Sequence, residues 1–147
     1  MVVKTVELYV EKPVEDLYIL DITKNVNDSI KQSAITNGLA TVFVGCTTAS
    51  ISTMHHEPRT VDEMHETLER LAPSAIDYEH HKTCGDLNGV GGDTNGKSHI
   101  RSALLGPSIT VPLKDGRLML DREQDIVLLD FDIIKRKRKI VVQIMGE

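Results

Sequence analysis

The stretch Ser108-Ile-Thr-Val-Pro-Leu-Lys-Asp-Gly-Arg-Leu-Met-Leu120 decides the fold class, because it predicts two strands joined by a tight turn. The turn is Lys114-Asp115-Gly116, and an apolar or β-branched run lies on each side of it. Further strands are expected at residues 125–131 and 139–145. Strands that follow one another through short turns pair antiparallel. The C-terminal part of the chain therefore predicts an antiparallel meander.

The N-terminal half predicts two more strands with a helix between them. Residues 2–10 alternate between apolar and polar side chains, which indicates a half-buried strand. Residues 39–44 are a short β-branched and aromatic run between two glycines, which indicates a buried strand. A helix is expected from Asp21 to a stop at Asn37-Gly38, because apolar residues recur every fourth position: Ile22, Val26, Ile30 and Ala34.

A second and a third helix are expected in the middle of the chain. Thr60–Glu63 has the form of a capping box, and the apolar face behind it continues to Pro73. Residues 82–98 are rich in glycine without an apolar period and predict a loop. Residues 99–105 predict one or two helical turns that end at Gly106-Pro107. Strands with segregated helices predict an α+β fold in one domain, residues 1–147.

Composition narrows the partners of this domain. The 147 residues carry a net charge of -5, with 3% aromatic residues and no Trp, so the chain offers repulsion to a phosphate backbone and little surface for base stacking. No apolar run is long enough to span a bilayer, and residues 1–12 do not resemble a secretory signal. We therefore expect a cytoplasmic protein that binds neither nucleic acid nor membrane.

Two local strings suggest anion binding, and neither has the context it needs. Gly91–Ser98 matches the phosphate-loop pattern G-x-x-x-x-G-K-S, but no apolar strand precedes it and the helix after it is short. The basic run Lys135–Lys139 could bind nucleic acid, yet the rest of the chain is acidic. We interpret the run as a solvated hairpin tip.

Histidine and cysteine are the most informative side chains for a site. All six histidines fall between positions 55 and 99, but no H-E-x-x-H or C-x-x-C spacing joins them. A metal site would have to be assembled in space from several segments. Cys46 follows a predicted buried strand, where it is either a site residue or a small buried apolar side chain.

Several strings taken together resemble the YjbQ family of secondary thiamine-phosphate synthases. They cover nearly the whole chain in the family's order and spacing: Gly45-Cys46-Thr47-Thr48-Ala49-Ser50-Ile51, His56-Glu57, Tyr78-Glu79-His80, Ser98-His99-Ile100-Arg101-Ser102, Leu105–Pro112, Gly116-Arg117-Leu118 and Gly146-Glu147. The resemblance implies a β-sandwich-like α+β fold with two to three helices, and a homotrimer with its site at the subunit boundary. It also implies a weak transferase activity that joins a hydroxymethylpyrimidine pyrophosphate to a thiazole phosphate.

The resemblance also implies a set of site residues and a divalent metal, Zn or Mg. The residues that match the suspected site by position are Cys46, Glu57, His80, Asp93, Asn95 and His99. Our hypothesis is that Cys46, His80 and His99 hold the metal and that Glu57, Asp93 and Asn95 are catalytic. We expect the phosphorylated metabolite to be bound by Thr47, Thr48, Arg101, Ser102 and Gln124.

The chain departs from the family pattern in three places. Cys46 stands where the family has His, Gly85–Gly92 is an inserted glycine-rich stretch, and Asp121–Gln124 replaces Gly-Thr-Trp-Gln. Two other functions therefore stay open. One is a metal-dependent hydrolase of a phosphorylated small molecule, and the other is a non-catalytic trimer that binds an anionic metabolite.

Overall fold

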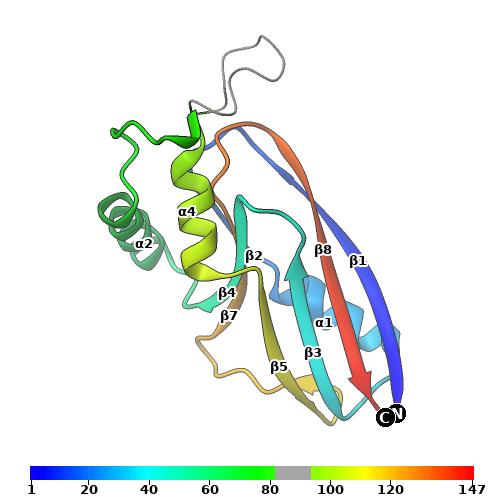
Figure 1. The fold of residues 1–147 in the computed structure, drawn as a ribbon. Coiled ribbons are helices and arrows are strands. Elements are labelled where there is room, and N and C mark those ends of the chain that lie inside the picture. The colour runs from blue at the N-terminus through cyan, green and yellow to red at the C-terminus, as the bar shows by residue number, and fades with distance from the viewer. Residues whose placement is uncertain (82–93) are drawn as a thin grey trace.

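Two antiparallel sheets form the framework of the computed structural model, which describes residues 1–81 and 94–147 (Figure 1). The larger sheet has the strand order β1-β8-β3-β5-β6, and the smaller has the order β2-β7-β4. The bounds in the larger sheet are β1 Val2–Lys12, β8 Arg136–Gly146, β3 Gly38–Val44, β5 Ser108–Lys114 and β6 Arg117–Leu118. Those in the smaller sheet are β2 Tyr18–Asp21, β7 Asp125–Asp130 and β4 Ala49–Met54.

The smaller sheet lies between the larger sheet and two of the helices. Alternate residues of β7 point to opposite faces. Ile126 and Leu128 join the core that also takes in the larger sheet and α1 (Thr23–Ser33). Val127 and Leu129 join a second core on the other face, which includes Leu68 of α2 (Pro58–Leu71). The third helix, α4 (Gly96–Leu105), packs against β4 beside α2 (Figure 1). The predicted α+β class, with mostly antiparallel strands and segregated helices, is confirmed.

The helices are where they were expected, but their ends differ. The first helix ends at Ser33, because the exposed Ala34 adopts a left-handed conformation with φ of 59°. The second begins at Pro58, not Thr60, and its N-cap is Glu57. Proline is favourable at the first helical position because its missing N–H has no partner there. The third begins at Gly96, three residues before the predicted start.

The prediction that the basic run Lys135–Lys139 is a solvated hairpin tip was wrong. Residues Arg136–Lys139 belong to β8, and β8 pairs with β1 along eleven residues. Arg138 is 7% exposed, whereas Lys137 and Lys139 are exposed. Side chains alternate along a strand, so the arginines face the interior and the lysines face solvent.

The backbones of β3 and β8 approach closely where Gly38 pairs with Gly146, and a Cβ on Gly38 would lie 1.9 Å from the Met145 carbonyl oxygen. In the described part of the chain, the helices are too short or too polar to cross a membrane.

Candidate functional site

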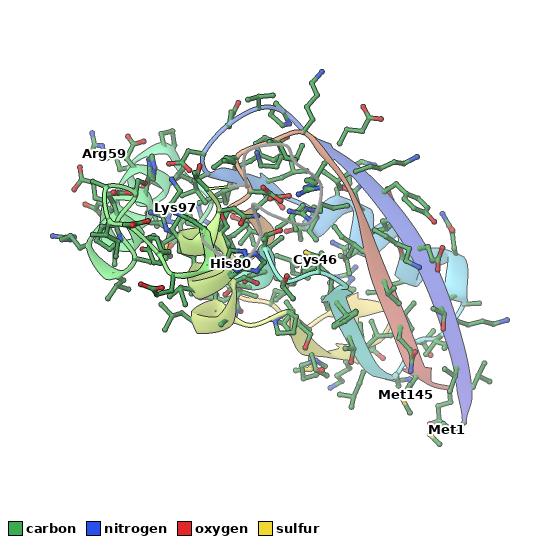
Figure 2. All side chains as sticks on the ribbon, turned by 45° about the horizontal axis from the view of Figure 1, so that its top comes forward. Met1, Cys46, Arg59, His80, Lys97 and Met145 are labelled. Carbon is green, nitrogen blue, oxygen red and sulfur yellow. The ribbon has the colours of Figure 1, made fainter. Side chains whose placement is uncertain are left out.

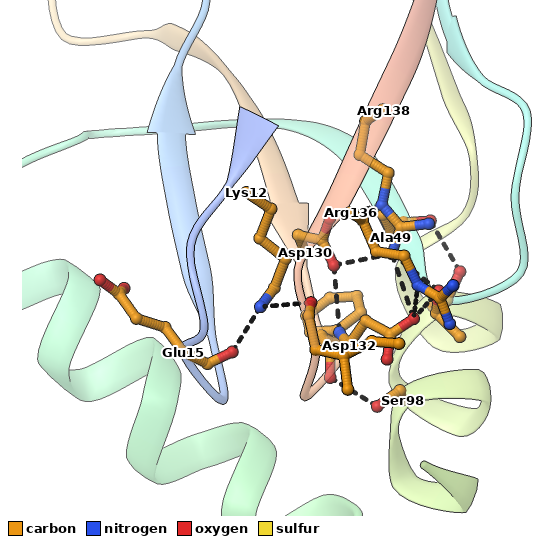
Figure 3. A network of polar contacts seen from close by, with 12 residues as sticks. Lys12, Glu15, Ala49, Ser98, Asp130, Asp132, Arg136 and Arg138 are labelled. Atoms are coloured by element: carbon orange, nitrogen blue, oxygen red, sulfur yellow. Dashed lines mark hydrogen bonds and ion pairs between the residues drawn. The ribbon is translucent and has the colours of Figure 1, made fainter. Parts of the chain in front are cut away.

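A buried network of charges lies around the connection between the end of β7 and the start of β8 (Figure 3). Asp130 and Asp132 are fully buried, and the guanidinium of Arg138 lies against the first of them. Its Nε is 2.5 Å and its Nη2 is 2.8 Å from the two carboxylate oxygens of Asp130. Such a two-point contact is the geometry in which arginine binds carboxylates most strongly. It compensates two charges that would otherwise be costly to bury.

Thr48 and Arg136 extend this network toward the surface. Thr48 Oγ1 accepts a hydrogen bond from Arg138 at 2.8 Å and donates one to Asp132 at 3.2 Å. Arg136 Nε is 2.7 Å from the same Asp132 oxygen, and its side chain is 37% exposed. Burial alone would raise the pKa of Asp132, but Arg136, the Ile133 N–H and Thr48 outweigh burial and hold that pKa below its usual value. Asp132 is therefore ionised at neutral pH.

His80 and His99 form a pair of imidazoles at the start of α4. Their ring centroids are 4.5 Å apart and the rings are inclined by 64°. Burial, and then electrostatic repulsion from His80, lower the pKa of His99 below its usual 6.5, and Asp132 and a hydrogen bond to the Thr47 backbone oppose them. Donation of one ring N–H to the Thr47 carbonyl leaves the other nitrogen of neutral His99 as a proton acceptor.

The predicted ligands do not assemble into a three-donor metal site in the residues that the structure describes. A zinc site needs at least three converging side-chain donors. Outside residues 82–93, no three His, Cys, Asp or Glu side chains converge in this way. His80 and His99 supply two nitrogens, while Cys46 packs partly buried against the core. Within the described residues the predicted ligands therefore supply two converging donors, one fewer than a zinc site needs, and Asp93 lies outside those residues.

Arg101 and Ser102 face the protein interior. Arg101 is fully buried, and its guanidinium donates to the Ala72 carbonyl at 2.8 Å and to Glu69 at 2.7 Å. Ser102 Oγ donates to the Ala49 carbonyl at 2.7 Å. Arg101 thus attaches α4 to the end of α2, and Ser102 attaches α4 to β4.

Glu57 and Asn95 lie at helix starts. The Glu57 carboxylate accepts hydrogen bonds from the Thr60 N–H at 2.6 Å, the Thr60 hydroxyl at 2.7 Å and the Arg59 N–H at 3.2 Å. Thr60 therefore donates to the cap and does not itself form it. Asn95 is 5% exposed, and its backbone carbonyl accepts from the N–H groups of Ser98 and His99.

Gln124 lies next to the end of the smaller sheet that is opposite the buried charges. The register pairs Ala49 with Asp130 at one end of β4 and Met54 with Asp125 at the other. Asp125 is five steps from Asp130, about 17 Å along β7, and Gln124 comes directly before Asp125. Its amide donates to Thr53 at 3.2 Å.

The phosphate-loop string has no free lysine to offer. Lys97 is 6% exposed, and its Nζ lies 2.5 Å from Asp16 and 2.7 Å from Ser74 Oγ. Figure 2 shows Lys97 and His80 at the end of the molecule away from Met1 and Met145. The glycines at 91 and 92 lie outside the described residues.

The structure adds charged residues that the sequence did not single out as a site: Lys12, Asp130, Asp132, Arg136 and Arg138. Acids two residues apart on one segment and arginines two residues apart on the next are the pattern that could have revealed most of them.

Solved structures of similar proteins share this fold. A YbjQ-like protein of unknown function from Sulfolobus solfataricus matches with a TM-score of 0.88 and 25% identity, over 99% of this chain and 98% of that one. A hypothetical protein from Aeropyrum pernix matches with a TM-score of 0.85 and 27% identity, over 98% and 99%.

Proteins of similar sequence match along most of this chain. A UPF0047 protein of Methanothermobacter thermautotrophicus is 33% identical over 129 residues, which cover 88% of this chain and 83% of that protein. A UPF0047 protein of Methanocaldococcus jannaschii is 30% identical over 148 aligned positions, which cover 100% and 99%. The family model described as UPF0047 protein YjbQ-like matches residues 7–147, and the chain therefore belongs to the YjbQ/UPF0047 family.

Proposed function

We propose that this protein is a transferase that joins a hydroxymethylpyrimidine pyrophosphate to a thiazole phosphate. The His80–His99 pair carries the proposal, because it places two imidazoles close to Asp132 of the charge network that also contains Arg136. In the reaction, the thiazole nitrogen bonds to the pyrimidine methylene carbon. The bond between that carbon and the pyrophosphate oxygen breaks, and its electron pair leaves with pyrophosphate.

The residues have distinct roles in this proposal. Arg136 is the arginine of the network with the larger exposed part, 37% against 8% for Arg138, so it is the one that a dissolved anion can approach. Its guanidinium offsets the charge that develops on the leaving pyrophosphate. His80 donates a hydrogen bond to the same group, and His99 stays oriented by the Thr47 carbonyl.

Hydrolysis would use the pair differently. Neutral His99 would accept a proton from water as that water attacks phosphorus, and no thiazole phosphate would be needed. The assay therefore follows both the condensation product and pyrophosphate or phosphate release, with and without thiazole phosphate.

His80→Asn is expected to lower kcat/KM for condensation by about a hundredfold or more, the usual scale for loss of one donor to a developing negative charge. His99→Asn is expected to act in the same direction, because the ring of His99 packs against His80 and positions it. His65→Asn, at an exposed position of α2, should stay within about twofold. Product below the molar amount of protein would overturn the proposal. Release of pyrophosphate or phosphate in the absence of thiazole phosphate would identify a hydrolase. Thermal stabilisation by the substrate without turnover would identify a non-catalytic binder.

A divalent metal, Zn or Mg, and a cytoplasmic homotrimer remain parts of this proposal. The metal test is the metal content of purified Cys46→Ala, His80→Ala and His99→Ala proteins against the His65→Ala control. If the metal content is the same in all of these variants as in the control, the metal is not part of the site. Light scattering tests the trimer, which would bring the site to a subunit boundary.

A further inference from the structure

A basic depression is lined by Arg136, the same arginine that contacts Asp132 of the buried network. Its volume is about 480 Å³, within the usual range for small-molecule sites. It is lined by Glu11, Lys12, Pro13, Lys135, Arg136 and Lys137. Four of these side chains are cationic and one is acidic, in a chain whose net charge is -5. Positive charge is therefore concentrated here against the trend of the whole molecule.

The floor of the depression is a buried lysine. Lys12 is 2% exposed, and its ammonium donates to the carbonyls of Pro13 at 2.9 Å and Glu15 at 2.6 Å. Figure 3 shows the Glu15 carboxylate pointing away from this ammonium, so the contact is with the neutral carbonyl. Burial lowers the pKa of Lys12, against the pull of Asp130 and Asp132. A nearby anion would favour the charged form of this lysine.

The walls are held in place by the strands. Glu11 and Lys12 of β1 pair in register with Lys137 and Arg136 of β8. Lys137 Nζ lies 5.1 Å from the centroid of the Tyr9 ring, which positions the ammonium without neutralising it. Asp132 offsets Arg136, and Glu11 can offset one of the three lysines Lys12, Lys135 and Lys137, which leaves two positive charges in excess.

We infer that this depression, hereafter the basic pocket, is a binding site for the phosphate or pyrophosphate group of a small molecule. Its size favours a small molecule over a nucleic acid, which the acidic remainder of the surface would repel. The basic pocket shares Arg136 with the proposed function, but the inference concerns binding of the anion and does not require the transferase reaction.

Calorimetric titration with inorganic pyrophosphate tests it. The variant Lys135→Gln/Lys137→Gln should weaken binding at least tenfold. The control Lys4→Gln/Lys114→Gln removes the same charge at exposed positions outside the basic pocket and should change binding less than twofold. Thermal melts of both variants verify folding. Failure of the wild-type protein to bind pyrophosphate, or an equal loss in both variants, would overturn the inference.

A His80→Asn variant separates this inference from the proposed function. Retained pyrophosphate affinity in that variant supports the basic pocket even if no transferase activity exists. Loss of affinity in His80→Asn with none in Lys135→Gln/Lys137→Gln would assign the anion to the imidazole pair and overturn the inference. The inference would also be overturned if a single-stranded oligonucleotide bound more tightly than pyrophosphate and lost its affinity in Lys135→Gln/Lys137→Gln.

Discussion

Replacing Arg138 with methionine should be strongly destabilising, because it leaves a buried carboxylate without its partner. The guanidinium makes two contacts with Asp130, whose side chain is fully buried, and one with Thr48. Removing one partner of a buried ion pair typically costs about 3–5 kcal/mol. For 147 residues, an unfolding entropy of roughly 0.3 kcal/mol/K converts about 4 kcal/mol into a drop of about 13 °C in Tm.

Urea denaturation at neutral pH, followed by circular dichroism, measures this loss. The matched control is Lys139→Met on the same strand, where the lysine pairs with Glu7 at 3.2 Å and both side chains are about half exposed. Exposed pairs are worth about 1 kcal/mol or less. Adding Asp130→Leu to Arg138→Met should restore part of the stability, since an apolar pair removes the uncompensated charge. If Arg138→Met costs no more than Lys139→Met, the network is not desolvated and the reasoning fails.

Three further substitutions test how the elements are joined. Hydrogen bonds from Ser74, and then the ion pair with Arg101, hold the pKa of Glu69 at about 2. The ionised carboxylate therefore stabilises the fold fully at pH values above the usual pKa of 4.5, and this contribution is lost as the pH falls toward 2. Glu69→Gln should therefore lower the free energy of unfolding at pH 7 by about 1 kcal/mol, a value kept small because the Glu69 side chain is 41% exposed. The difference in urea midpoint between wild type and variant should narrow below pH 4.5. A difference that stays constant with pH would contradict this. Gly38→Ala should lower stability by about 3 kcal/mol or more in thermal melts, because its Cβ would collide with backbone. Gly116→Ala, with open space but a φ of +73°, should cost about 1 kcal/mol, and equal losses would show that the β3–β8 approach is not tight.

Periodicity predicted the long strands and the helices, but not β4. The sequence Ala49-Ser-Ile-Ser-Thr-Met54 has few β-branched residues and no clean alternation. Its buried Ser50 is acceptable because its hydroxyl donates to the Ser102 carbonyl at 3.1 Å. That partner lies on α4, fifty-two positions away, so local sequence carries no sign of it. The four residues of β2 are too few to show a period.

The basic run was misread for a related reason. A count of charges treats Lys135–Lys139 as uniform, whereas a strand separates alternate residues onto two faces. Arg138 can be buried only because Asp130, eight positions earlier, supplies the opposite charge. Composition predicts the average environment of a residue type, and pairing across segments decides the individual case.

Residues that a family resemblance gathers into one site can serve different purposes. His80 and His99 meet in space, as the resemblance implies, and Asp132 lies close enough to influence the pKa of His99. Arg101 instead binds the end of α2. Substitution at Arg101 should lower stability first, whereas substitution at His80 or His99 should lower activity in a protein that still folds.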